Sequence, residues 1–248
     1  MTELERAVRL IDEAESITVL TGAGTSAESG IPIFRDALTG LWARFDPMEL
    51  ATPEAFERDP QLVWDWYAER RRKVRECRPN EGHRALARLE GVCPGFTLIT
   101  QNVDGLHQRA GNRNVHELHG NILRVRCVRE GTRFNDWQEV DTEGPARCPD
   151  CGALLRPDVV WFGELLPTDA FAAAERAARS CDVFLVVGTS GMVYPAAGLA
   201  HLAAASGAGV IEVNPEETPL SATARYSLRG PAGEMLRQLT KDCSPTES

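Results

Sequence analysis

The segment Ile17–Ala27, which reads ITVLTGAGTSA, decides the fold. Its first four residues are apolar and β-prone, and a turn that contains Gly22 and Gly24 follows them after a single threonine. Such a run predicts a buried strand, a tight turn and a helix. The glycines match the fingerprint G-x-G-x-x-G/A, in which the backbone approaches a pyrophosphate at a helix N-terminus. The segment therefore predicts a nucleotide-binding α/β unit.

Three further apolar runs resemble this first strand and predict a parallel sheet. They are Phe96–Ile99, Val183–Val187 and Val210–Val213, and helical periodicity alternates with them, beginning over residues 3–15. Continuous apolar strands that alternate with helices indicate an α/β fold whose sheet is covered on both faces. Ligands of such sheets bind beyond the carboxyl ends of the strands, so we expect the site in the polar turns there. These turns are Gln101-Asn102, Gly188-Thr189-Ser190 and Asn214-Pro215.

The chain after the glycine turn departs from the dinucleotide site of ordinary dehydrogenases. In those enzymes a second strand ends in Asp or Glu about 20 residues further on and binds the ribose. Here the region Gly30–Asp36 continues as a loop and a helix, and no second strand is predicted. Asn214, at the end of a later strand, is our candidate for holding a ribose hydroxyl instead. The sequence thus favours nucleotide binding over ordinary hydride transfer.

Composition and charge restrict the partners. The 248 residues are 43% hydrophobic, and the formal net charge of −9 argues against nucleic acid, whose phosphates bind mainly Lys and Arg. No apolar run reaches the roughly 20 residues of a membrane-spanning helix, and the acidic, amphipathic N-terminus is unlike a signal peptide. We therefore expect a cytoplasmic protein without membrane contact. The basic stretch Arg70–Arg75 is interpreted as a solvated helix face, with Arg70 treated separately below.

Five separated motifs resemble the signature blocks of the sirtuin family, in the order in which sirtuins carry them. The resemblance runs from about residue 16 to about residue 235 and so covers most of the chain. The blocks are Gly22-Ala23-Gly24-x-Ser26, Gly30-Ile31-Pro32-x-Phe34-Arg35, Gln101-Asn102-Val103-Asp104-x-Leu106-His107, His116-Glu117-Leu118-His119-Gly120 and Gly188-Thr189-Ser190.

The resemblance implies a fold and a reaction. The whole chain would be one catalytic domain, with a Rossmann-like parallel-sheet part at about 1–35, 85–120 and 160–240. A small inserted module would have a helical part at about 36–84 and a zinc-ribbon-like part at about 121–158. The implied reaction cleaves NAD, releases nicotinamide and transfers the acyl group of an acylated protein lysine to ADP-ribose.

The resemblance also implies roles for individual residues. His119 matches the general base, and imidazole, with an unperturbed pKa of about 6.5, accepts a proton near neutrality. Asn102 and Asp104 match further catalytic positions, and Phe34 would cover the nicotinamide pocket. The residues implied in NAD binding are Gly22, Ala23, Gly24, Ser26, Ala27, Phe34, Arg35, Gln101, Asn102, Asp104, Gly188, Thr189, Ser190, Asn214 and Ala232. The histidines interpreted as structural are His83, His107 and His116.

Tyr67 and Arg70 lie at i and i+3 of a helix expected over residues 60–74, so their side chains project from one face. A phenol and a guanidinium together suit a carboxylate. The segment is similar to that of class III sirtuins, in which a Tyr-x-x-Arg pair receives succinyl, malonyl or glutaryl groups beside a small residue, here Ala51. Acetyl would then be the weaker substrate, unless Arg70 is merely a solvated arginine. The segment Val160-Trp161-Phe162 resembles the one on which the substrate peptide adds as a strand, with an ordinary buried strand as the alternative.

A zinc site is indicated but departs from the family pattern. Cys148-Pro149-Asp150-Cys151 has the spacing of half a zinc knuckle, and a structural zinc ion needs four ligands. The other half should begin at Cys127, yet its second position holds Glu130. Retained zinc, with Glu130 or a water as the fourth ligand, is the preferred interpretation; loss of the metal, with packing or a labile disulfide in its place, is the alternative. The cysteines interpreted as reduced thiols are Cys77, Cys93, Cys181 and Cys243.

Two other functions would share the NAD site. A mono-ADP-ribosyltransferase would move ADP-ribose to a protein side chain, and the product mass distinguishes it from a deacylase. A non-catalytic NAD- or ADP-ribose-binding module would keep its function when His119 is replaced by Ala.

Overall fold

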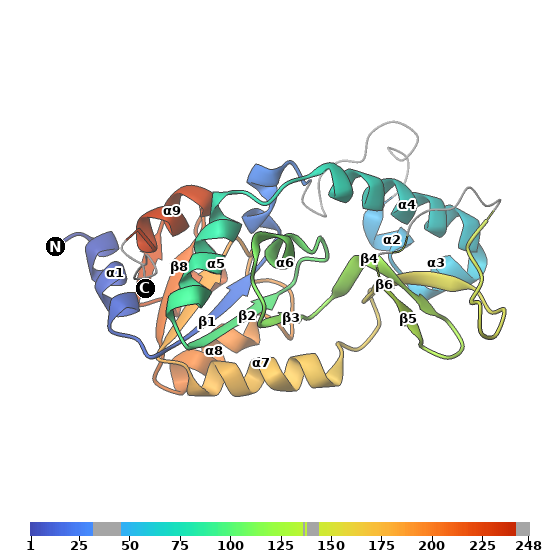
Figure 1. Ribbon diagram of the computed structural model, residues 1–248. Helices are drawn as coiled ribbons and strands as arrows, with labels where there is room; N and C mark the ends of the chain where they lie inside the picture. Colours follow the sequence, from blue (N-terminus) through green and yellow to red (C-terminus); the bar gives the residue numbers. More distant parts are fainter. Residues whose placement is uncertain (32–45, 136, 138–143, 242–248) are drawn as a thin grey trace.

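The computed structural model describes residues 1–31, 46–135, 137 and 144–241. Its larger part is a six-stranded sheet in the order β3-β2-β1-β7-β8-β9, in which all neighbouring strands are parallel (Figure 1). The chain builds outward from β1 to β3 and then adds β7 on the other side of β1, so the order changes direction there. The strands are β1 (Ser16–Thr21), β2 (Gly95–Thr100), β3 (Val115–Glu117), β7 (Val183–Val187), β8 (Gly209–Val213) and β9 (Tyr226–Leu228).

Helices cover both faces of this sheet because side chains alternate along each strand (Figure 1). In β7, Val183 and Leu185 share a buried cluster with α1, α5 and α9, whereas Phe184 and Val186 share another with α7 and α8. Among the helices of the described residues, none has both the length and the apolar character that a membrane span requires. The helices are α1 (Glu3–Asp12), α5 (Glu81–Val92), α6 (Leu106–Ala110), α7 (Thr168–Ser180), α8 (Gly198–Ala205) and α9 (Ala232–Leu239).

The predicted fold class is confirmed, and the four apolar runs form β1, β2, β7 and β8. The two outer strands, β3 and β9, were not predicted. Each has three residues and a mixed sequence, and each pairs with only one neighbour in the sheet. Such short edge strands depend on the pairing rather than on their own hydrophobic pattern.

The helix predicted after the glycine turn is wrong. Two short 3-10 turns, η1 (Ala23–Thr25) and η2 (Ala27–Ser29), take its place, and Gly30 at a φ of +80° ends them. The Ser26 hydroxyl, between the two turns, donates to Asp104 at 2.7 Å. Serine side chains that bond elsewhere compete with helix formation, so tertiary hydrogen bonding keeps this stretch out of a regular helix.

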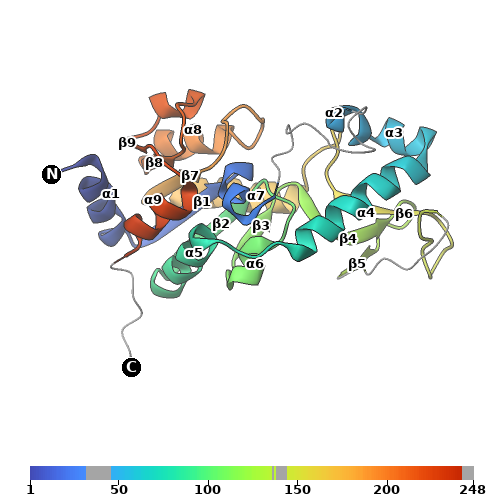
Figure 2. The same cartoon turned by 90° about the horizontal axis from the view of Figure 1, so that it is seen from above.

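A smaller unit lies at one end of the molecule, beyond the parallel sheet (Figure 2). It contains a three-stranded antiparallel sheet in the order β5-β4-β6, against which helix α4 packs. Its side chains form two buried clusters separate from those of the large sheet. The elements are α2 (Pro47–Leu50), α3 (Pro53–Arg58), α4 (Pro60–Glu76), β4 (Gly120–Cys127), β5 (Arg133–Phe134) and β6 (Leu155–Val159).

The basic stretch lies in α4, and its interpretation as a solvated face is wrong for Arg71. Arg72 and Lys73 are exposed, but Arg71 is fully buried. Its Nη1 donates to Ile122 O at 2.9 Å, and its guanidinium lies 5.5 Å from the ring centre of Trp64. The register of the β4–β6 ladder shifts around residue 122. The guanidinium therefore donates a hydrogen bond to a carbonyl at the point where the sheet is irregular.

We expect Arg71→Ala to lower the free energy of unfolding by about 2–4 kcal/mol, because it leaves a cavity and a buried carbonyl without its donor. Arg72→Ala is the matched control, one residue along the same helix and exposed, and should change stability by less than about 0.5 kcal/mol. Urea denaturation followed by circular dichroism measures both. Equal stability of the two variants would contradict a structural role for Arg71.

Candidate active site

The carboxyl ends of β1, β2 and β7 meet where the strand order changes direction, and their turns contact one another. Gly24 N donates to Gly188 O at 2.8 Å. The Gln101 amide donates to Thr189 Oγ1 at 3.1 Å. A Cβ on Gly22 would lie 2.7 Å from Thr189 Cβ, and one on Gly24 would lie 2.8 Å from Gly188 O, so only glycine fits at both positions. The turn after β1 and the turn after β7 therefore form one unit.

The remaining predicted NAD contacts near this unit are of two kinds. Ala23, Ala27 and Ser190 belong to the same turns and are exposed. Phe34 and Arg35 lie outside the described residues. The predicted cover of the nicotinamide pocket therefore stays a prediction.

A buried polar network adjoins the glycine turn. Ser26 Oγ donates to Asp104 Oδ2 at 2.7 Å and accepts from the Asn102 amide at 3.1 Å. The same Asn102 amide donates to Gly22 O at 3.0 Å. His83 Nε2 lies 3.3 Å from Ser26 Oγ, and burial lowers the pKa of His83 to about 4, so the ring is neutral. Burial also raises the pKa of Asp104, against the effect of its hydrogen bonds. The network holds the catalytic candidates Asn102 and Asp104 in fixed positions.

His119 lies between β3 and β4. Its Nδ1 is 2.9 Å from Gln101 O, and a carbonyl only accepts hydrogen bonds, so Nδ1 carries the ring proton and Nε2 keeps its lone pair. Burial lowers the pKa of His119 below 6.5, although the hydrogen bond to Gln101 opposes this shift. Gly120 follows at a φ of +79°, where a Cβ would collide with Asp158 O. The arrangement gives a neutral imidazole with a basic nitrogen at pH 7.

His83 and His107 pack against each other inside the protein, with ring centres 4.8 Å apart. His107 Nε2 lies 3.0 Å from Thr21 Oγ1, while its Nδ1 has no hydrogen-bond partner among the described residues. Burial lowers the pKa of His107, so this ring is neutral as well. Both rings belong to the packed interior, as their structural interpretation expects.

The candidates for the adenosine side of NAD are already engaged within the chain. The Asn214 amide donates to Glu216 O at 2.9 Å. Ala232 is buried at the beginning of α9, where Gly233 N donates to the Glu28 carboxylate at 2.6 Å. The ribose contact by Asn214 and the contact by Ala232 stay predictions.

Glu212 is a buried acid in β8 that the sequence analysis did not single out. Its carboxylate accepts from Ser221 Oγ at 2.6 Å and from Arg229 Nη1 at 2.8 Å, and Thr218 Oγ1 also donates to it. Burial raises the pKa of Glu212, but these hydrogen bonds outweigh it and lower the pKa below the ordinary value. A lone acid within the apolar run Val210–Val213 was the signal that could have identified it. Glu212 fixes the loop that follows Asn214.

The acyl-pocket candidates Ala51 and Tyr67 share one buried cluster with Trp161, a residue of the predicted peptide-binding segment. Trp161 Nε1 donates to the Tyr67 hydroxyl at 3.0 Å. Burial raises the pKa of Tyr67 to about 12, so the hydroxyl keeps its own proton as a donor. Arg70 lies half-buried one turn along α4, with its guanidinium 5.0 Å from the ring centre of Trp66. The structure thus brings the Tyr-x-x-Arg pair to the edge of a buried aromatic cluster.

The segment Val160–Phe162 does not continue a strand, because β6 ends at Val159, so its interpretation as an ordinary buried strand is wrong. Its three consecutive N–H groups are all used within the chain. They donate at 2.9, 2.8 and 2.9 Å, respectively, to His119 O, Glu164 Oε2 and Ala51 O. A peptide that pairs with this segment would therefore meet its carbonyl groups.

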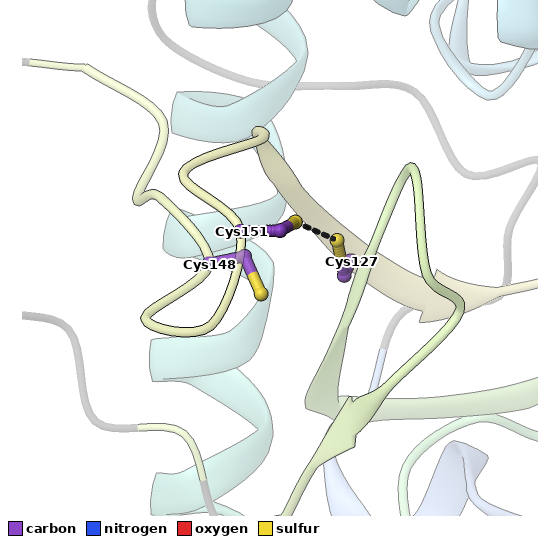
Figure 3. Close-up of side chains that lie close together, drawn as sticks. All are labelled: Cys127, Cys148 and Cys151. Carbon is purple, nitrogen blue, oxygen red and sulfur yellow. Dashed lines mark hydrogen bonds between the residues drawn. The ribbon is translucent and has the colours of Figure 1, made fainter.

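Three of the four predicted metal ligands come together. The Sγ atoms of Cys127, Cys148 and Cys151 all lie within 4.8 Å of one another, and Figure 3 shows the 3.4 Å contact between Cys127 and Cys151. Thiolates bound to one zinc ion at about 2.3 Å lie about 3.8 Å apart, so these residues fit zinc. Within the described part of the chain, the Glu130 carboxylate does not join this group; only its main-chain N–H reaches Cys127 Sγ, at 3.4 Å.

Comparison with known proteins identifies the family. Residues 22–195 match the sequence profile described as "Sir2 family". The chain belongs to the Sir2 family. It is 54% identical over 224 residues to an "NAD-dependent protein deacylase" of Aquifex aeolicus (strain VF5), with 90% of this chain and 93% of the relative covered.

Solved Sir2 structures have the same fold as this Sir2-family chain. A Sir2 homologue in complex with NAD superposes with a TM-score of 0.92 at 48% identity, over 96% of this chain and 93% of the other. A Sir2 protein bound to acetylated peptide superposes with a TM-score of 0.87 at 32% identity, over 98% of both chains. The glycine turn and the strand ends described above thus belong to a fold that binds NAD in a close relative.

The fall in activity at acid pH, the acid limb of the pH–rate profile, should reflect protonation of His119. Since burial lowers its pKa below 6.5, the basic form predominates at pH 7, and kcat/KM should fall as the pH drops through a value below 6.5. A pH–rate profile from pH 5 to 8 measures this. His119→Ala should lower kcat/KM by roughly 100- to 10,000-fold, and the remaining activity should no longer fall with this pH dependence. A limb above pH 7 in the unaltered protein would rule out this assignment.

Glu212→Gln should raise the KM for NAD by about 3- to 10-fold with little change in kcat, because a neutral amide holds Arg229 and the loop after β8 less firmly. Glu216→Gln, an exposed acid of the same loop, is the control and should leave KM unchanged. Steady-state kinetics with varied NAD provide the measurement. A loss confined to kcat would show that Glu212 does not position the NAD site.

Proposed function

We propose that this Sir2-family chain removes acidic acyl groups, such as succinyl, malonyl and glutaryl, from protein lysines. At the coarser level of the family, the chain is an NAD-dependent protein deacylase. The finer preference is supported by one observation: Tyr67 and Arg70 lie together at the edge of the buried cluster that contains Ala51 and Trp161.

The two donors suit a carboxylate for a physical reason. The Tyr67 hydroxyl accepts from Trp161 and keeps its proton, so that proton is available to a ligand oxygen. Arg70 supplies a positive charge whose burial is costly, as its lowered pKa indicates. A carboxylate offsets that cost, whereas an acetyl group supplies no charge. Ala51, with its small side chain, would leave room for the longer acyl chain.

The chemistry is divided between NAD and the chain. NAD, when bound, supplies the leaving nicotinamide and the ADP-ribose to which the acyl group passes. The unit of Gly22, Gly24 and Thr189 would hold it, because only glycine lets the two turns come so close. His119 Nε2 would take the proton of a ribose hydroxyl, since Nδ1 is committed to Gln101 O. Asn102 and Asp104 would orient the sugar.

The other partner is an acylated lysine of a protein. A Sir2 protein at 32% identity has been solved with an acetylated peptide bound. In this chain the segment Val160–Phe162 would offer carbonyl groups to the peptide backbone, since its N–H groups are engaged. Main-chain pairing of this kind gives affinity with little sequence selectivity.

Incubation with NAD and a panel of acyl-lysine peptides, followed by mass spectrometry, tests the proposal. We expect acyl-ADP-ribose and free lysine peptide, fastest with succinyl, malonyl or glutaryl peptides. A peptide that gains the mass of ADP-ribose would indicate a mono-ADP-ribosyltransferase instead.

Arg70→Met should lower kcat/KM for succinyl peptide by about 100-fold, the size of one buried charge-assisted hydrogen bond. The acetyl peptide should change by less than about threefold, because it makes no contact with the guanidinium. Arg72→Met, exposed on the same helix, is the matched control. An equal fall for both peptides would mean that Arg70 does not receive the acyl carboxylate.

A further inference from the structure

The three thiolates of Cys127, Cys148 and Cys151 fit the zinc ion that the family resemblance implies, and we propose that its fourth ligand is a solvent molecule rather than Glu130. This site is independent of the acyl preference proposed above. β4 begins at Gly120, next to His119, and ends seven residues later at Cys127. At about 3.3 Å per residue the two ends are about 23 Å apart, so the zinc site lies far from the base.

The three thiols are held by the main chain in the positions that a metal requires. Cys148 N donates to Ala153 O at 2.7 Å, and Gly152 N donates to Cys148 O at 2.9 Å, so the Cys148–Cys151 knuckle is a closed turn. Arg129 and Arg147 donate to carbonyls at Cys151 and Gly152 and bring positive charge near the cluster. Positive charge favours the ionised thiols that bind zinc.

Glu130 occupies the sequence position of a fourth cysteine, but its side chain does not lie where a cysteine side chain would lie. The turn after β4 is closed by Gly131 N, which donates to Cys127 O at 3.0 Å with a φ of +70°. This turn points Glu130 N at Cys127 Sγ, at 3.4 Å, and leaves the Glu130 side chain exposed. A cysteine sulfur lies one bond from Cβ, whereas a glutamate oxygen lies three bonds away. From this turn the carboxylate therefore extends past the point that a thiolate would reach.

Cys127 and Glu130 both line a cleft of about 950 Å³ between the β4–β5 hairpin and α3, together with Pro53, Phe56 and Leu154. One water occupies about 30 Å³, so the cleft admits water and larger monodentate ligands. Three thiolates and a water leave the zinc site with one negative charge, and a carboxylate would raise this to two. The geometry and the charge thus both favour solvent, and the water should exchange for other small ligands.

Metal content separates the two candidate ligands. Purified protein should contain about one zinc per chain, Cys148→Ala should lose it, and Glu130→Ala should keep it at the unaltered level. Glu130→Cys should complete a four-thiolate site and slow zinc release to a chelator by roughly tenfold or more. Glu130 is exposed, so these two variants test the proposal even if Cys148→Ala does not fold.

Cobalt(II) substitution tests the open position directly. Added imidazole should shift the visible spectrum of the cobalt form in the unaltered protein and in Glu130→Ala, but not in Glu130→Cys. Three results would overturn the proposal: loss of zinc in Glu130→Ala, a cobalt spectrum that imidazole leaves unchanged, or unaltered protein that contains no metal and carries a Cys127–Cys151 disulfide.

Discussion

The hydrogen bond from Gly24 N to Gly188 O is the contact on which the site depends. It joins the turn after β1 to the turn after β7, on the two sides of the point where the strand order reverses. No larger residue fits between these turns, so their approach is fixed by glycine alone. Because Gly22 O also receives the Asn102 amide, the end of β2 is tied to the same contact. Three strand ends that are far apart in sequence thus share one rigid edge.

Burial sets the chemical state of the groups around this edge. The rings of His83 and His107 are neutral because charging them inside the protein is costly, and His119 is neutral at pH 7 for the same reason. His119 is distinguished from the other two by its hydrogen bond to a main-chain carbonyl, which assigns the proton to Nδ1 and leaves Nε2 as a base. Burial supplies a basic nitrogen, and a single main-chain acceptor decides which nitrogen it is.

The local sequence is enough to predict the long strands of the parallel sheet. The features that it did not predict depend on tertiary contacts. Val183–Val187 is predictable because a continuous apolar run of this length has few alternatives to a buried strand. The absence of a helix after the glycine turn depends on Ser26 bonding to a residue almost 80 positions away, which no local pattern contains. Arg71 was predicted to be solvated because a run of arginines has no apolar period, and its burial follows from the packing of α4 against β4. The ordered motifs indicated the site residues, but the placement of Glu130 depends on turn geometry.

The short turns after β1 have a consequence for how an anion is held at this edge. A long α-helix would present its N-terminal field to a phosphate, but the segment that follows Gly22 and Gly24 within the described residues forms only 3-10 turns. At the N-terminus of α9, the carboxylate of Glu28 already accepts a hydrogen bond from Gly233 N and so occupies that end of the helix. Within the described turn, Gly22, Gly24, Thr25 and Ser26 already donate their main-chain N–H groups to carbonyls of the chain. A bound anion at this edge therefore has to be held by groups other than the dipole of a long helix and these four N–H groups.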